Sequence, residues 1–178
     1  MSEQVHISPD GVKYRLVATK NTTPTTDTQA KPITVDSQEV EVIVSDGRLI
    51  SQGSQWGHVA IAIDKKVYSR AHSTYYTTTL DKYLSDNSYR DSIGLVLRVS
   101  ESEKQKIQAE LERRVAINAE YSLISNSCST NVADVLEMIG ILAHDPRYLD
   151  TPVSPKELLI VVSRSKRIKK RIDYPKSK

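Results

Sequence analysis

Cysteine and phenylalanine are the residues that this sequence most lacks. It has one cysteine, Cys128, and no phenylalanine, beside nine tyrosines and one tryptophan. One cysteine excludes an internal disulfide framework and any zinc site built from several cysteines. Without phenylalanine, we expect a modest core made mainly of Val, Ile and Leu. The thiol of Cys128 is either an inert buried group or a reactive one.

Long apolar runs are missing as well. No window approaches the length of a membrane span, and the N-terminal segment "MSEQVHISPDGVKYRLV" lacks the apolar core of a signal peptide. We therefore expect a protein made in the cytoplasm, without a transmembrane segment. Any export would need a route that reads no cleaved signal.

The chain has only a small excess of positive charge. Its 25 basic and 22 acidic residues give a net charge of +3, and much of the excess lies in the C-terminal segment "RSKRIKKRIDYPKSK". A basic run can meet nucleic acid, anionic lipid or an acidic polymer. We expect a solvated tail here, and no nucleic-acid partner.

A length of 178 residues suits one packed domain. Residues 20–38 are rich in Thr, Pro and polar residues without periodicity, which is typical of a linker or a long surface loop. We expect an N-terminal extension and linker over 1–38, one domain over 39–163, and a basic tail over 164–178.

The hydrophobic pattern predicts an α+β fold with a compact antiparallel sheet. "EVEVIV" and "SIGLVLRV" have the composition of strands, and "WGHVAIAID" with "KVYSRAH" predicts a hairpin. A short helix over "TTLDKYLSD" would be capped by Thr78 or Thr79. A longer helix after Ser100 has a capping box with Glu103. Two more helices are expected, over 127–139 and from Pro155 onward.

The helix over 127–139 carries the cysteine. Cys128, Val132, Val135 and Ile139 share one stripe, so the thiol is directed toward the apolar side. If Asn126 or Ser127 caps the helix, Cys128 lies in its first turn, where free backbone N–H groups favour a thiolate. The stripe by itself favours a packed core residue. The polar neighbours in "SNSCSTN" favour a wet helix start and a nucleophile.

A nucleophilic thiol needs a base, normally a histidine. We expect His6 and His144 to be surface residues, whereas His58 and His72 lie in the hairpin. Small residues on the face of His58 would leave room for a packed helix. A three-residue turn "DKK" would bring His58 opposite His72, and a two-residue turn "KK" would bring Ser73 there.

Taken together, "WGHVAIAIDKKVYSRA" and the later "YSLISNSCSTNVADVLEMIGI" resemble the permuted NlpC-type branch of the papain-like cysteine hydrolases, which includes lecithin retinol acyltransferase. In that branch the histidine strand precedes the cysteine helix, as it does here. The likeness covers roughly residues 40–163. It implies a papain-like fold in which the sheet packs against the helix that bears the cysteine.

The resemblance also implies roles for particular residues. Cys128 would be the nucleophile, His58 the general base, and His72 the best match to the orienting polar group on the next strand. Tyr121 matches a family tyrosine ahead of the cysteine. Together with Trp56 and Ser127 we expect it to contact substrate, although many relatives have Asn where this chain has Ser127. The resemblance calls for neither a metal nor an organic cofactor.

Relatives of this kind cut peptidoglycan peptides, acyl lipids or isopeptide bonds, and a shared fold does not select among these. We expect a cysteine peptidase or amidase that acts on peptidoglycan as an antibacterial effector of the type VI secretion kind. It would work in the periplasm of a target cell, with an immunity protein and a secretion carrier as partners. A lipid-directed acyltransferase or thioesterase, and a binding module without catalysis, remain the alternatives.

Overall fold

This computed structural model describes residues 38–46, 57–122, 126–148 and 152–177, together with the backbone of two short strands near the N-terminus. The chain divides into two units, Met1–Thr34 and Val35–Lys178. In the first unit, β1 (Val5–Ile7) pairs antiparallel with β2 (Lys13–Arg15). The linker expected over 20–38 lies almost wholly outside the described residues.

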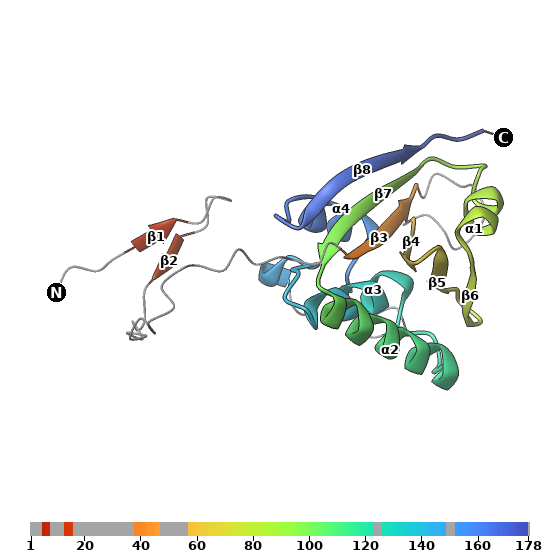
Figure 1. Cartoon of the computed structure of the whole chain (residues 1–178), viewed down its shortest axis with the longest axis horizontal. Helices are drawn as coiled ribbons and strands as arrows, with labels where there is room; N and C mark the ends of the chain where they lie inside the picture. Colours follow the sequence, from red (N-terminus) through yellow and green to blue (C-terminus); the bar gives the residue numbers. More distant parts are fainter. Residues whose placement is uncertain are drawn as a thin grey trace. The chain divides into compact units, whose positions relative to one another are not determined.

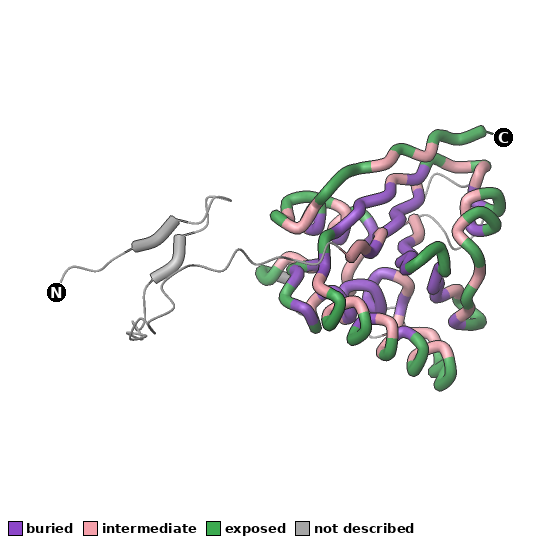
Figure 2. The backbone as a smooth tube through the Cα atoms, viewed as in Figure 1, coloured by how far each residue is buried: buried purple, intermediate pink, exposed green. Residues whose placement is uncertain are grey.

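The second unit is built on a six-stranded antiparallel sheet (Figure 1). Its strands, in spatial order, are β6 (Tyr75–Thr79), β5 (Lys66–Arg70), β4 (His58–Ile63), β3 (Gln38–Ser45), β7 (Ser92–Val99) and β8 (Ile168–Tyr174). The central strands are buried, and the exposed residues gather on the helices and the outer strands (Figure 2). The α+β class expected from the sequence is confirmed.

In the described part of this unit, four α-helices cover the two faces of the sheet unequally. They are α1 (Leu80–Asp86), α2 (Glu101–Ile117), α3 (Cys128–Glu137) and α4 (Pro155–Ser163), and a 3-10 turn, Pro146–Tyr148, lies between α3 and α4. The main core joins one sheet face, including Val42 and Val59, to side chains of α2, α3 and α4. A smaller cluster on the other face joins Ile43 and Ala60 to Tyr83 of α1. We call these the main-core face and the α1 face.

Helix ends follow the capping residues in the sequence. Thr79 caps α1, Ser100 forms the expected capping box with Glu103 at the start of α2, and Ser154 caps α4 ahead of Pro155. In each case the cap oxygen accepts a backbone N–H that the first turn leaves unpaired. These local signals explain why the helix starts were predictable.

The hairpin of β4 and β5 differs from both expected turns. Asp64 and Lys65 form a two-residue turn, with φ of 49° and 65°, so that Ile63 pairs with Lys66. Positive φ at both positions suits the right-handed twist of the flanking strands, and Asp tolerates it without glycine. The pairing therefore sets Ser69 opposite Ala60, and neither His72 nor Ser73 comes opposite His58.

The expected basic tail is instead part of the sheet. Residues Ile168–Tyr174 form β8, which pairs along β7 as an edge strand. The alternating Ile172 and Tyr174 lie on the α1 face, since Ile172 pairs with Gly94 and Tyr174 with Ser92. The domain thus extends beyond residue 163. Lys and Arg side chains between the apolar positions suit a strand that has one solvent-facing edge.

Gly94 is placed where a larger side chain would collide. A Cβ added there would lie 2.0 Å from Glu41 Oε1 and 3.0 Å from Tyr174 Cε2. The same Oε1 atom accepts a hydrogen bond of 2.7 Å from the Tyr174 hydroxyl. We expect Gly94→Ala to lower the free energy of unfolding by about 1–3 kcal/mol through overpacking, measured by urea denaturation.

A second substitution separates the collision from other effects of the added methyl group. In a Glu41→Ala background, Gly94→Ala should cost much less, which a double-mutant cycle detects. An equal cost in both backgrounds would contradict the explanation.

Candidate active site

Cys128 is the first residue of α3, as the sequence indicated. Ser127 precedes it in extended conformation, and its hydroxyl caps the helix by accepting the backbone N–H of Thr130 at 3.2 Å. Val132 and Val135 behind it are buried in the main core, while Cys128 itself is only half-buried. The cysteine therefore stands at the rim of the core.

The thiol is closer to a neutral group than to the expected thiolate. Burial raises the pKa of Cys128, and the nearby backbone N–H groups of Val59 and Ser129 lower it by less. The position at a helix start does favour ionisation, but desolvation outweighs it. At neutral pH the free protein holds a protonated thiol.

The polar residues around Cys128 are buried and bonded to one another, which corrects the expectation of a wet helix start. Ser129 donates to the carbonyl of Val153, and Asn131 donates to Asn126 Oδ1 and to the carbonyl of Ser127. Ser127 is only 3% exposed. Its hydroxyl serves the helix cap, so the prediction that Ser127 contacts substrate is wrong.

His58 opens β4 on the α1 face. Its Nε2 forms a hydrogen bond of 2.7 Å with the Ser69 hydroxyl of β5, which also lies on this face. Its Nδ1 has no hydrogen-bond partner among the described residues. Burial of the ring, and then the charge of Arg90, lower the pKa of His58 to about 4. The imidazole is therefore neutral at neutral pH and has one ring nitrogen available.

Cys128 and His58 both lie near the N-terminal end of β4, but on different faces of the sheet. The Val59 N–H next to His58 is close enough to influence the thiol, yet α3 packs on the main-core face, and His58 is on the α1 face. The helix for which the small residues beside His58 leave room is α1, whose Tyr83 lies there, whereas α3 packs on the other face of the sheet. Within the described residues no hydrogen bond joins the thiol to His58.

His72 does not take the third position. It is exposed, and its ring lies against that of Tyr121, with 4.8 Å between centroids. The hairpin register is the reason, because the two-residue turn at Asp64 and Lys65 gives the position beside His58 to Ser69.

Two tyrosines flank the thiol. Tyr121 is half-buried, and burial and then the nearby Cys128 raise its pKa, which places it beside the cysteine as the sequence suggested. Tyr83 of α1 lies 6.4 Å from His58 between ring centroids. Its buried hydroxyl makes no well-formed hydrogen bond among the described residues, although the Ser45 hydroxyl lies beside it. Trp56, also assigned to substrate contact, lies outside the described residues.

Ser69, Tyr83 and Arg90 are the residues around His58 that sequence reasoning missed. Ser69 could have been found by testing the two-residue turn "DK", which sets it on the face of His58. Tyr83 and Arg90 carry no local signal, because α1 and the segment after it reach His58 only through the tertiary fold.

The part of the chain that the structure describes shows no candidate metal centre. No group of three or more His, Cys, Asp or Glu side chains is placed there to hold an ion. In the same residues no helix is long and apolar enough to cross a membrane.

Comparisons with known proteins bear on the fold only. No family model and no curated protein matches this chain. The structure is similar to a crystal structure of the metalloprotein yiiX (DUF1105) from Escherichia coli O157:H7, with a TM-score of 0.54 and 16% identity. The match covers 79% of this chain and 98% of that one. The two proteins thus share an arrangement of strands and helices.

Proposed function

We propose that this protein is a papain-like cysteine hydrolase of the permuted NlpC type that cleaves amide bonds. One observation carries the proposal: the Nε2 atom of His58 is held by Ser69, and Nδ1 is left free at the strand end where Cys128 begins α3. An oriented base and a thiol at a helix start, both near one strand end, are the groups that cysteine hydrolysis needs.

The charge states favour general-base catalysis over a resting ion pair. Both partners are neutral at neutral pH, because burial raises the pKa of the thiol and lowers that of His58. When substrate brings the two groups into hydrogen-bond distance, Nδ1 takes the thiol proton as Sγ attacks the acyl carbon. His58 returns that proton to the departing amine, leaving a thioester. Water then cleaves the thioester, with His58 again as base.

The start of α3 supplies donors for the intermediate. The N–H of Cys128 belongs to the first turn, where helix N–H groups have no partner within the helix. Such an N–H can stabilise the oxyanion that forms on the acyl oxygen. Tyr121 lies beside the thiol and offers its hydroxyl as a second donor.

Ser69 has the orienting role in this proposal. It is fully buried, with 0% exposure, so substrate cannot reach it as a nucleophile. Its hydrogen bond to Nε2 fixes the plane of the imidazole and leaves Nδ1 as the nitrogen that acts as the base. His72 has no catalytic role in this proposal, because it is exposed and its ring lies against that of Tyr121.

We place the substrate among peptidoglycan peptides, and the biological role with interbacterial effectors delivered to a target periplasm. This rests on the resemblance of the histidine strand and cysteine helix to the NlpC-type branch. An immunity protein and a secretion carrier would be its partners.

A binding module without catalysis is the second candidate, and one feature favours it. The described residues show a protonated thiol and no hydrogen bond from it to His58. In that case Cys128 would be a packed residue at a helix start.

Expression in a bacterial periplasm distinguishes these candidates. The wild-type chain should lyse cells and change the muropeptide profile of the wall, whereas Cys128→Ala and His58→Ala at equal abundance should do neither. His72→Ala serves as the matched control and should lyse cells like wild type. Lysis by the Cys128→Ala chain would refute the thiol mechanism, and an unchanged wall with wild type would refute peptidoglycan as substrate.

A further inference from the structure

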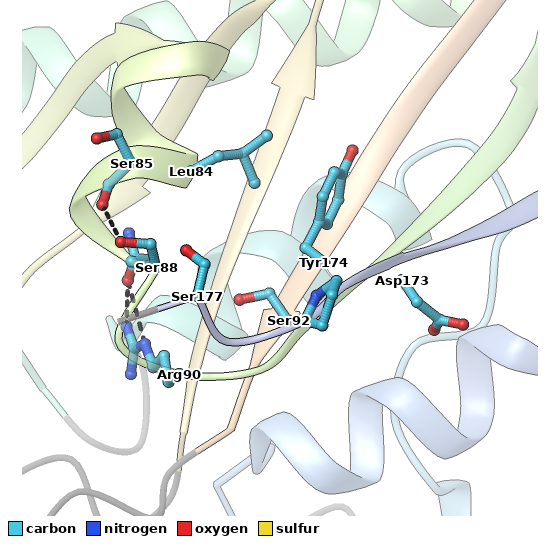
Figure 3. Close-up of a pocket in the computed structure, with 10 residues that line it drawn as sticks. Leu84, Ser85, Ser88, Arg90, Ser92, Asp173, Tyr174 and Ser177 are labelled. Carbon is cyan, nitrogen blue, oxygen red and sulfur yellow. Dashed lines mark hydrogen bonds between the residues drawn. The ribbon is translucent and has the colours of Figure 1, made fainter.

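A cavity of about 380 Å³ lies on the α1 face, between the end of α1 and the end of β8. Its size suits a small-molecule group or a peptide side chain. Its lining combines apolar surface, including Leu84, with polar side chains, including Ser85, Ser88, Arg90, Ser92, Tyr174 and Ser177 (Figure 3).

Among the described residues, Arg90 is the only basic side chain of this lining. Its Nε and Nη2 atoms both donate to Asn87 Oδ1, at 3.1 and 2.7 Å. No carboxylate among the described residues pairs with it, and its Nη1 has no hydrogen-bond partner there. A half-buried guanidinium held at one edge by a neutral amide is ready to bind an anion with its other donors.

Two acidic residues need to be placed relative to Arg90. Asp91 follows it in the chain, and its Oδ1 accepts the backbone N–H of Lys176 at 2.8 Å. Asp173 is the one acidic residue among the described residues of the lining. Its side chain points away from the others in Figure 3, and its Oδ1 accepts a hydrogen bond from Arg171 Nε. Four serines and Tyr174 contribute hydroxyl groups to the lining, beside Leu84, Asn87 and Pro175. Ser88 and Ser177 lie near Arg90, joined by a backbone hydrogen bond of 2.9 Å.

The cavity lies on the same sheet face as His58. One row of paired residues runs across the α1 face from Tyr174 through Ser92 and Ser45 to His58. Ser92 and Ser45 share a buried hydrogen bond of 2.8 Å. Arg90 is near enough to His58 and Tyr83 to influence both electrostatically. A substrate that extends from His58 along this row would place a group in the cavity.

We propose that this cavity is a subsite for a carboxylate of the substrate, bound by Arg90, so that the enzyme acts on peptides with a free carboxyl group. The inference rests on the proposed hydrolase function and makes it more specific. Stem peptides of peptidoglycan carry such carboxylates, whereas the acyl chain of a neutral lipid does not.

Binding in the absence of turnover tests the subsite. The probes are the tripeptide L-Ala-γ-D-Glu-meso-diaminopimelate and its fully amidated form, titrated by calorimetry into full-length Cys128→Ala protein. Arg90→Gln, which keeps a donor for Asn87, should weaken binding of the acid by about 10- to 100-fold, the loss expected for a charge-assisted hydrogen bond. It should leave binding of the amide unchanged.

A matched variant controls for net charge and for folding. Arg98→Met removes one positive charge from an exposed position at the far end of β7 and should bind the acid as tightly as the parent protein. Equal binding of acid by Arg90→Gln and its parent, or equal loss for acid and amide, would overturn the subsite. Arg90-dependent binding of the acid without hydrolysis by wild type would support the subsite and count against the hydrolase.

Discussion

Replacing Cys128 by alanine is expected to lower amide hydrolysis by at least about 10³-fold, the scale seen when a catalytic nucleophile is removed. The reason is that no other described nucleophile can take its place, because the nearby Ser69, Ser127 and Ser129 are buried at 3% exposure or less. The measurement is kcat/KM of purified protein on stem peptides released from peptidoglycan. Mass spectrometry of the quenched wild-type reaction should also detect an acyl group on Cys128.

Two further substitutions compare the contributions of Ser69 and His72 to catalysis. Ser69→Ala removes the hydrogen bond to Nε2 and should lower kcat by up to about 10²-fold, with little change in KM, because it misorients the base without touching substrate. His72→Ala is the matched control on the same hairpin and should change kcat less than about twofold, since its ring contacts Tyr121 and not His58. If His72→Ala were the more damaging change, the assignment of Ser69 would be wrong.

The free energy of unfolding should fall by about 3 kcal/mol between pH 6.5 and pH 4 because of His58 alone. The folded protein holds the ring neutral, with its pKa lowered to about 4 first by burial and then by Arg90, whereas the unfolded chain binds a proton near pH 6.5. The unfolded state thus takes up protons first as the pH falls. The stability is fully present above pH 6.5 and is lost as the pH falls through about 4.

Urea denaturation across this range, with wild type and His58→Gln in parallel, measures the effect. The difference between the two should shrink steadily toward pH 4, while His72→Ala should follow the wild-type curve. Carboxylates whose pKa is lowered, such as Glu110 and Asp145 at about 2, also lose stabilisation as the pH falls toward and below 4, but they are common to all three proteins and cancel. Glu41, whose pKa is raised by burial, is common to all three proteins and cancels in the comparison. A constant difference across the range would show that the ring is not held neutral.

The parts of the fold that the sequence predicted are those set by short-range chemistry. Ser100 with Glu103, Ser154 with Pro155, and Thr79 each mark a helix start, because a cap needs only residues within one turn. Cys128 could be placed at the start of α3 for the same reason. Alternation in β3 and β4 likewise predicted buried strands, since side chains on a strand alternate between its faces.

The errors arose where one residue of register or one long-range pairing decides the outcome. The turn at Asp64 and Lys65 differs from the expected turns in its position along the chain, and that shift gives the place beside His58 to Ser69 and leaves His72 on the surface. The basic segment became β8 only because β7 offers it an edge with which to pair. Neither preference can be read from a window of neighbouring residues.

By itself, then, the sequence determined the α+β class, the helix starts and the position of Cys128 in the first turn of a helix. Only the tertiary structure decided which groups surround His58. Ser69, Tyr83 and Arg90 come to it from β5, from α1 and from the segment before β7. The protonation of the site also depends on this packing, because burial raises the pKa of Cys128 and lowers that of His58. Desolvation of this kind depends on the whole fold, so no local motif could have predicted it.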